Sequence, residues 1–171
     1  KAEHSIEFQL VFLGRYLRTG FRIVPVLCGS FHEFVGMQVD PFSDARFTAF
    51  RDNMARVLGG EAGRVLVVAG VDFSHVGRKF GHDRGAAELV NRARAHDRDI
   101  LECLGNRDAA GILRLSRQAR DWSHVCGLPA LVLFATILSV PTKAELLCHE
   151  TYDEPATQSA VTYAAMVFHR S

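Results

Sequence analysis

Hydrophobic positions along this 171-residue chain recur at spacings that predict alternating helices and strands. Recurrence every three or four residues predicts helices at 3–18, 44–58, 83–104, 107–120 and 123–138. Apolar runs rich in Val, Leu and Phe predict strands at 21–29, 64–72, 143–153 and 160–170. Helices alternating with buried strands are typical of α/β proteins. We therefore expect a three-layer α/β fold in which helices flank a central, mostly parallel sheet.

The first predicted helix combines an apolar body with a polar first turn. Phe8 and Phe12 widen its apolar stripe, so the helix is apolar on most sides and is expected to be buried. Glu3, His4 and Glu7 crowd its N-terminus. Buried polar groups must be paired or must bind something. The pattern therefore marks His4 as a candidate ligand.

Composition narrows the classes of protein that fit. A chain with 48% hydrophobic and 23% charged residues can build the core of one domain, which we place at 1–171. The net charge is +1 and the two signs alternate, so nothing favours a nucleic-acid or membrane-surface partner. The longest apolar run, 127–140, is too short to span a bilayer. Four widely spaced cysteines without a CxxC pair are typical of a reduced, cytoplasmic protein.

Candidate chemistry falls at the ends of predicted elements. Asp72 and His75 follow the strand 64–72, where open α/β sheets bind their ligands. Cys126 stands at the start of the helix 123–138, where backbone N–H groups would stabilise a thiolate. Histidine and cysteine are the side chains that bind zinc, iron and copper well.

Three sequence stretches resemble the Memo family: EHSIEFQL at 3–10, DFSH at 72–75 and the Cys126-Gly127 pair. Bacterial and archaeal members of that family often occur as protein B of the AmmeMemoRadiSam system. The family is similar in fold to class III extradiol dioxygenases, which are non-haem iron enzymes. The resemblance implies a pocket of two histidines and one cysteine that binds iron or copper.

Residue by residue, the resemblance implies that His4 and Cys126 are metal ligands. It also implies that His75 is a catalytic acid or base, with Asp72 orienting it or binding a cation. A cysteine in place of the usual carboxylate makes the site favour copper or zinc over iron. We interpret His124 and His149 as structural residues rather than pocket residues.

The chain also departs from the family pattern. The first metal histidine of the family lies in an upstream segment that this sequence does not contain. We therefore expect an N-terminally truncated member that lacks the family's N-terminal portion and binds metal weakly. Gly70 and Val71 stand where the family usually has two serines, which removes hydroxyl groups near the pocket.

Three functions fit these features, and they leave open whether the protein is an enzyme. The first is a metal-dependent redox or oxygen-using enzyme acting on a small molecule, with a radical SAM enzyme as a system partner. The second is a non-catalytic module that binds a peptide or protein in the same pocket. The third is a zinc-dependent hydrolase or lyase.

Overall fold

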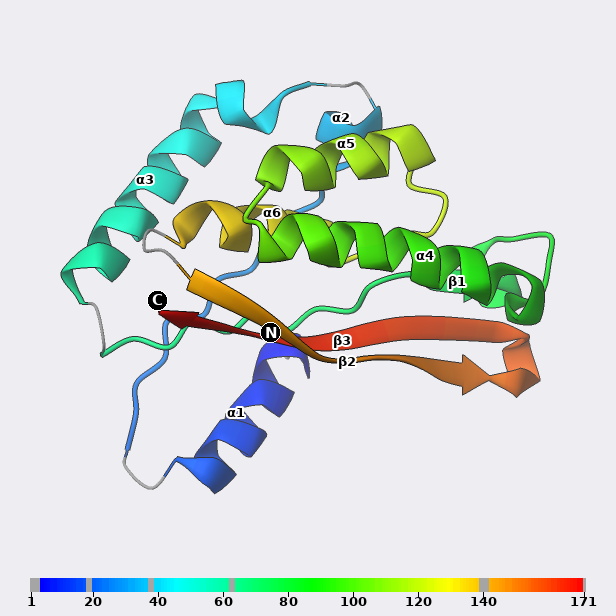
Figure 1. Ribbon diagram of the computed structural model, residues 1–171, viewed down its shortest axis with the longest axis horizontal. Coiled ribbons are helices and arrows are strands. Elements are labelled where there is room, and N and C mark those ends of the chain that lie inside the picture. The colour runs from blue at the N-terminus through cyan, green and yellow to red at the C-terminus, as the bar shows by residue number, and fades with distance from the viewer. Residues whose placement is uncertain (1–3, 18–19, 37–38, 62–63, 139–141, 171) are drawn as a thin grey trace.

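A computed structural model describes residues 4–17, 20–36, 39–61, 64–138 and 142–170 (Figure 1). The α-helices are α1 (His4–Tyr16), α2 (His32–Gly36), α3 (Ala45–Gly60), α4 (Ala86–Gly105), α5 (Ala109–Ala119) and α6 (Leu128–Ile137). The strands are β1 (His75–Gly77), β2 (Thr142–Glu154) and β3 (Ser159–Arg170). Short 3-10 helices lie at Pro41–Ser43, Arg78–Phe80 and Pro155–Thr157. The chain thus mixes helices and strands, as an α/β protein does.

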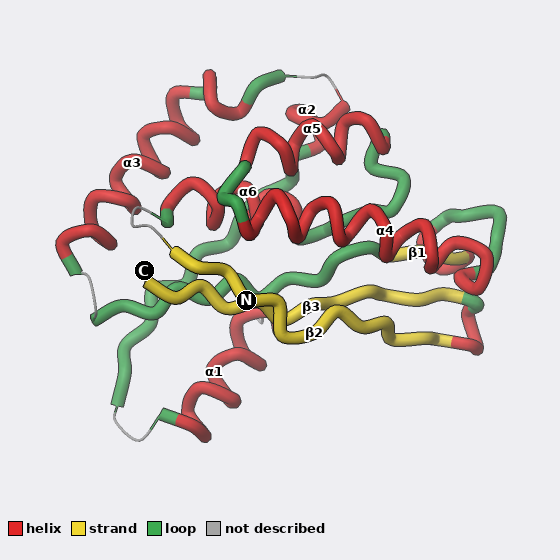
Figure 2. The backbone as a smooth tube through the Cα atoms, viewed as in Figure 1, coloured by secondary structure: helices red, strands yellow, loops and turns green. Residues whose placement is uncertain are grey.

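The sheet of the described residues is built around the last strand. β3 pairs antiparallel with β1 on one side and with β2 on the other, so the strand order is β1-β3-β2. Pro155–Thr157 turns the chain between β2 and β3, and a bulge interrupts their register between Leu146 and Cys148. Helix α4 packs on this hairpin, whereas α1 lies on its other side in Figure 2.

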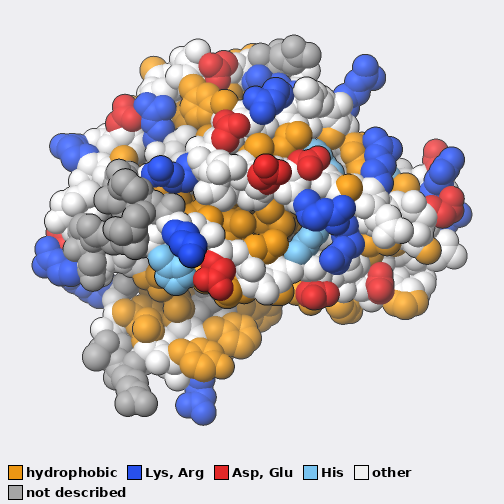
Figure 3. All heavy atoms as spheres, viewed as in Figure 1, with side chains coloured by type: hydrophobic (Ala, Val, Ile, Leu, Met, Phe, Trp, Pro, Cys, Tyr) orange, Lys and Arg blue, Asp and Glu red, His pale blue; other side chains and the backbone are white. Residues whose placement is uncertain are grey.

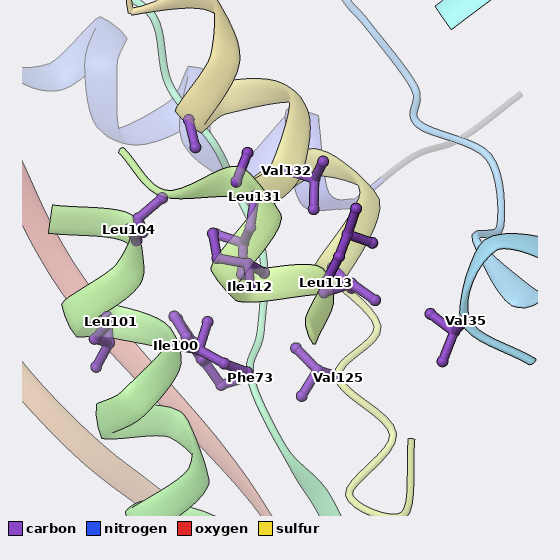
Figure 4. Close-up of a cluster of buried hydrophobic side chains, with 13 residues drawn as sticks. Val35, Phe73, Ile100, Leu101, Leu104, Ile112, Leu113, Val125, Leu131 and Val132 are labelled. Carbon is purple, nitrogen blue, oxygen red and sulfur yellow. The ribbon is translucent and has the colours of Figure 1, made fainter. Parts of the chain in front are cut away.

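The main core lies where α4, α5 and α6 meet. Ile100, Ile112 and Val132 are fully buried there, and Phe73 reaches the same cluster from the segment that precedes β1 (Figure 4). Apolar residues on the inner face of each helix supply this cluster, as the helical periodicity predicts. Helix α5 is also capped, because the Asp108 carboxylate accepts a hydrogen bond from the backbone N–H of Gly111. Helix α5 is therefore fixed by both packing and a capping hydrogen bond, whereas α4 and α6 begin without a side-chain cap.

The prediction of a mostly parallel sheet is not confirmed. The described ladders are antiparallel, and the segments predicted as strands at 21–29 and 64–72 form no strand in the structure. Both segments run as connecting loops in Figure 2. Strand propensity favours an extended backbone, but a strand also needs a neighbour to pair with. β2 pairs along the length of β3, whereas the ladder on the other side of β3, with β1, covers only residues 159–161 and does not extend to the segment 64–72.

The prediction that the first helix is buried is wrong for the described structure. None of the residues of α1 is buried, and the side chains of Phe8 and Phe12 are more than half exposed. Figure 3 shows hydrophobic side chains on the surface over this helix. The sequence pattern shows which side chains are apolar, but burial also requires a surface to pack against.

In the described residues, no helix is long and apolar enough to cross a membrane.

Candidate functional site

The DFSH segment crosses from the extended run 64–74 into the sheet. Phe73 is buried in the main core and Ser74 is fully buried, so these two residues fix the segment from inside. The side chain of Asp72 is 55% exposed, whereas that of His75 is only 15% exposed. The segment therefore presents a carboxylate and an imidazole at the edge of the protein interior.

Two backbone carbonyls hold the His75 ring. Its Nδ1 lies 3.1 Å from the carbonyl oxygen of Phe73 and 3.1 Å from that of His124. Because a carbonyl oxygen can only accept, this arrangement places a proton on Nδ1. The other nitrogen, Nε2, lies 3.7 Å from the Asp72 carboxylate, which is too long for a direct hydrogen bond. The Nε2 lone pair is thereby left for a metal ion or a proton.

The carbonyl of His124 reaches His75 because of an unusual backbone. His124 has a positive φ of 48°, in the left-handed region that few residues other than glycine adopt. Such conformations are concentrated at functional sites, where the surrounding structure imposes them. His124 therefore serves the pocket through its main chain. No sequence pattern marks a contribution of this kind, which explains why sequence reasoning missed it.

A glycine brings Cys126 to the same place. A Cβ atom added at Gly127 would lie 2.5 Å from Cβ of Val71 and 2.8 Å from the carbonyl oxygen of Asp72. Only glycine permits this close approach, which sets the first turn of α6 against residues 71–72. The Cys126-Gly127 pair of the sequence thus has a structural reason: the glycine places the thiol beside Asp72.

The surroundings of Cys126 favour its protonated form. Burial against neighbouring protein atoms raises the pKa of the Cys126 thiol, although the residue keeps an exposed surface. The Asp72 carboxylate raises this pKa further, because a negative neighbour disfavours a thiolate. Backbone N–H groups of Asp72 and Gly127 act in the opposite direction. A cation in the pocket would favour the thiolate, because its charge would offset that of the Asp72 carboxylate.

The three side chains together offer a set of metal-binding atoms. One ligand atom each from Asp72, His75 and Cys126 lies within 4.8 Å of the other two. Protein ligands lie about 2.0 to 2.3 Å from zinc in a tetrahedral arrangement, so two ligand atoms on one ion are about 3.3 to 3.8 Å apart. The 3.7 Å between His75 Nε2 and the Asp72 carboxylate falls within this range, and ligand atoms as much as 4.8 Å apart would have to move inward by about 1 Å. Sulfur, imidazole nitrogen and carboxylate oxygen make a mixed set that suits zinc, copper or iron better than magnesium or calcium.

The remaining predicted ligand, His4, lies outside this group of three. It begins α1, its side chain is exposed, and its ring contacts that of Phe8 edge-on, with centroids 6.2 Å apart. The helix nevertheless starts beside the pocket segment, because a Cβ added at Gly70 would lie 2.6 Å from the carbonyl oxygen of Ser5. The absence of a side chain at Gly70 thus permits the approach of α1. Glu3 falls outside the described residues.

Residues 1–167 match the profile of a family described as "Memo-like protein". A MEMO1 family protein of Aquifex aeolicus is 30% identical over 172 residues, which cover 99% of this chain and 41% of that relative. A MEMO1 family protein of Thermococcus kodakarensis is 33% identical over 183 residues, covering 99% of this chain and 57% of the relative. The chain thus spans about half the length of these curated relatives. No solved structure matches it.

Proposed function

This chain belongs to the Memo-like protein family, and on that premise we propose that Asp72, His75 and Cys126 bind a transition-metal ion. The observation that supports the proposal most is the gathering of one sulfur, one nitrogen and one oxygen atom within 4.8 Å. Cys126 would bind as a thiolate and His75 through Nε2. His4, at the start of the neighbouring helix, stays a predicted further ligand.

The donor set decides which metal chemistry the pocket would support. A thiolate with imidazole favours copper(I) or zinc over the hard cations, and it also accepts iron(II). A bound ion of this kind would supply Lewis acidity or redox chemistry towards a small molecule. The chain's own contribution is to hold His75 in one tautomer and to place the Asp72 carboxylate beside it. We propose a metal-dependent redox or oxygen-using activity on this basis.

A second use of His75 is supported by its contact with Asp72. With Nδ1 held by carbonyls and Nε2 facing a carboxylate at 3.7 Å, the ring could take up or release a proton. In that arrangement the metal would be held by Cys126 and His4, and His75 with Asp72 would serve as the catalytic pair. The two arrangements predict different effects of removing the imidazole.

Cobalt(II) titration of the reduced protein tests the proposal, because thiolate ligation gives a near-ultraviolet absorption band. Cys126→Ser should abolish that band, whereas Cys148→Ser, a matched change at another free cysteine, should keep it. His75→Ala should weaken binding by at least the roughly 10–100-fold that loss of an outer hydrogen bond costs. The matched control is His169→Ala, at a side chain 57% exposed on β3.

The same titration separates the two arrangements and can overturn both. Cobalt binding that survives His75→Ala but is lost with His4→Ala would assign His75 to proton transfer. An unchanged band in Cys126→Ser would contradict a metal site at this pocket.

For a protein that does bind metal, oxygen uptake with iron(II) or copper(I) would distinguish an oxygen-using enzyme from a zinc hydrolase that works without oxygen. Peptide binding that needs no metal and survives Cys126→Ser would identify a binding module.

A further inference from the structure

A second polar cluster lies directly behind the pocket, inside the protein. Its members are Ser74, on the DFSH segment, Asp97, on α4, and His149, on β2. The Ser74 hydroxyl donates to Asp97 Oδ1 at 2.6 Å, and Asp97 Oδ2 lies 3.2 Å from His149 Nε2. Ser74 and the Asp97 side chain are fully buried, and the His149 side chain is 6% exposed. Three elements distant in sequence therefore meet at one buried carboxylate.

The order of the groups argues against a nucleophilic role for the serine. In a Ser-His-Asp triad the histidine stands between the other two and removes the proton of the hydroxyl. Here the carboxylate of Asp97 stands in the middle, and Ser74 donates to it. A buried carboxylate is costly unless it is fully partnered. Its two partners, Ser74 and His149, are therefore held in place by the need to satisfy it.

The backbone of Ser74 is fixed as firmly as its side chain. Its N–H donates to Thr162 Oγ1 at 2.8 Å, and its carbonyl accepts from the Thr162 N–H at 2.9 Å. The next N–H along the chain, that of His75, donates to the Ser123 carbonyl at 2.7 Å. Ser74 also follows Phe73, whose carbonyl holds the His75 ring. The serine thus joins the group that orients the imidazole to the backbone that carries it.

We infer that Asp97 and His149 are positioning residues for the pocket, which hold Ser74 and through it the ring of His75. This inference rests on the proposed metal function only where the readout is metal affinity. The orientation of the ring can be measured without any metal.

Ser74→Ala is the mildest test, because it removes only the hydroxyl that donates to Asp97. The matched control is Ser116→Ala, since Ser116 is 1% exposed and its hydroxyl has no hydrogen-bond partner within the described part of the chain. In the metal-free protein, ¹⁵N shifts of the His75 ring should report one tautomer, with the proton on Nδ1. Ser74→Ala should mix the tautomers and speed amide exchange at His75 about tenfold. Ser116→Ala should do neither.

Two changes at His149 separate positioning from general stability. His149→Gln keeps an N–H donor within reach of Asp97, whereas His149→Leu removes it. The glutamine should retain the wild-type ring shifts of His75, and the leucine should reproduce the effect of Ser74→Ala. Cobalt(II) affinity should follow the same order, with a loss of about 10–100-fold in the broken variants.

The outcomes are distinct for the two proposals. Ring shifts and amide exchange in Ser74→Ala that equal those of Ser116→Ala would overturn the positioning role, whatever the metal affinity. If the wild-type protein binds no cobalt(II), the proposed function fails, and the metal-free ring shifts still decide the inference. If His149→Leu does not fold, Ser74→Ala and His149→Gln decide it.

Discussion

Residues before Asp72 and residues after it differ in how much of their side-chain surface is buried. Among the described side chains, Val35 and Pro41 are the only ones before Phe73 that are buried. From Phe73 onward, α4, α5, α6 and the hairpin contribute nearly the whole core. Both regions carry clear hydrophobic patterns, so the pattern alone does not decide burial. What differs is whether a matching surface is present to pack against.

The candidate pocket lies at the border between these two regions. His75 and Cys126 belong to the packed region, and the buried cluster of Ser74, Asp97 and His149 adjoins His75 through Ser74. His4 belongs to the exposed helix α1. Segments with few buried contacts open more readily than a packed core does. We therefore expect the group of three to be held more rigidly than the predicted fourth ligand.

Removal of large side chains gives the largest expected difference between the regions. Ile112→Ala, at a fully buried position of α5, should lower the free energy of unfolding by about 2–5 kcal/mol. Phe12→Ala, at a position of α1 that is 63% exposed, should change it by less than about 0.5 kcal/mol. Urea unfolding measures both values. Similar losses for the two variants would mean that α1 is packed as tightly as the core.

Added methyl groups at two glycines should have opposite effects. Gly127→Ala would force its Cβ into Val71 and should destabilise the fold by about 1–3 kcal/mol while moving Cys126 from Asp72. Gly14→Ala, in α1 with nothing within 4 Å, should stabilise by about 0.5–1 kcal/mol, because alanine favours a helix. Thermal unfolding checks the signs. A harmless Gly127→Ala would disprove the close approach of α6 to the pocket segment.

Two cysteines should respond differently to loss of the Asp72 charge. Burial raises the pKa of both the Cys28 and the Cys126 thiol, but the Asp72 carboxylate raises only that of Cys126. Asp72→Asn should therefore lower the Cys126 pKa, so that more thiolate is present at pH 8 and iodoacetamide reacts faster. The rate at Cys28 should stay unchanged. Peptide mass spectrometry over a pH series reads both rates, and equal responses would place Asp72 away from Cys126.

The free energy of unfolding should also show a small pH dependence, which arises from His96 in the packed region. Burial lowers the pKa of His96, and within the described part of the chain its Nε2 has no hydrogen-bond partner. In the unfolded chain the His96 imidazole therefore binds a proton near the ordinary histidine pKa, whereas in the folded chain it stays neutral at that pH. Stability should accordingly fall as the pH drops through about 6.5. His96→Gln should flatten this slope in urea unfolding, and an unchanged slope would assign it to another group.

The sequence predicts local structure better than it predicts pairing. The helices α3 to α5 and the strands β2 and β3 lie close to their predicted ranges, because a helical period and a β-rich run act within a few residues. Helix α6 begins at Leu128 rather than at 123. The strands expected at 21–29 and 64–72 fail, because a ladder depends on residues far away in sequence. Helix α1 forms within its predicted range, but the prediction that it is buried fails for the same reason, because its apolar stripe does not specify what covers it.

The candidate pocket shows the same difference between local features, which the sequence predicts, and tertiary contacts, which it does not. The sequence motifs indicate Asp72, His75 and Cys126 as candidates, and the structure brings them together. The supporting groups depend on tertiary contacts and could not be found in this way. The carbonyl of His124 requires a left-handed backbone, and the Asp97 carboxylate lies 23 positions from the serine that it holds.

X-ray absorption of the zinc-loaded protein tests the metal site most directly. For a zinc ion bound in this pocket, we expect one sulfur atom at about 2.3 Å from the zinc and the other ligands, nitrogen or oxygen, at about 2.0 Å. The sulfur signal should vanish in Cys126→Ser and persist in Cys28→Ser. A zinc site without sulfur, or one whose sulfur survives Cys126→Ser, would contradict the assignment of Asp72, His75 and Cys126 as the metal centre.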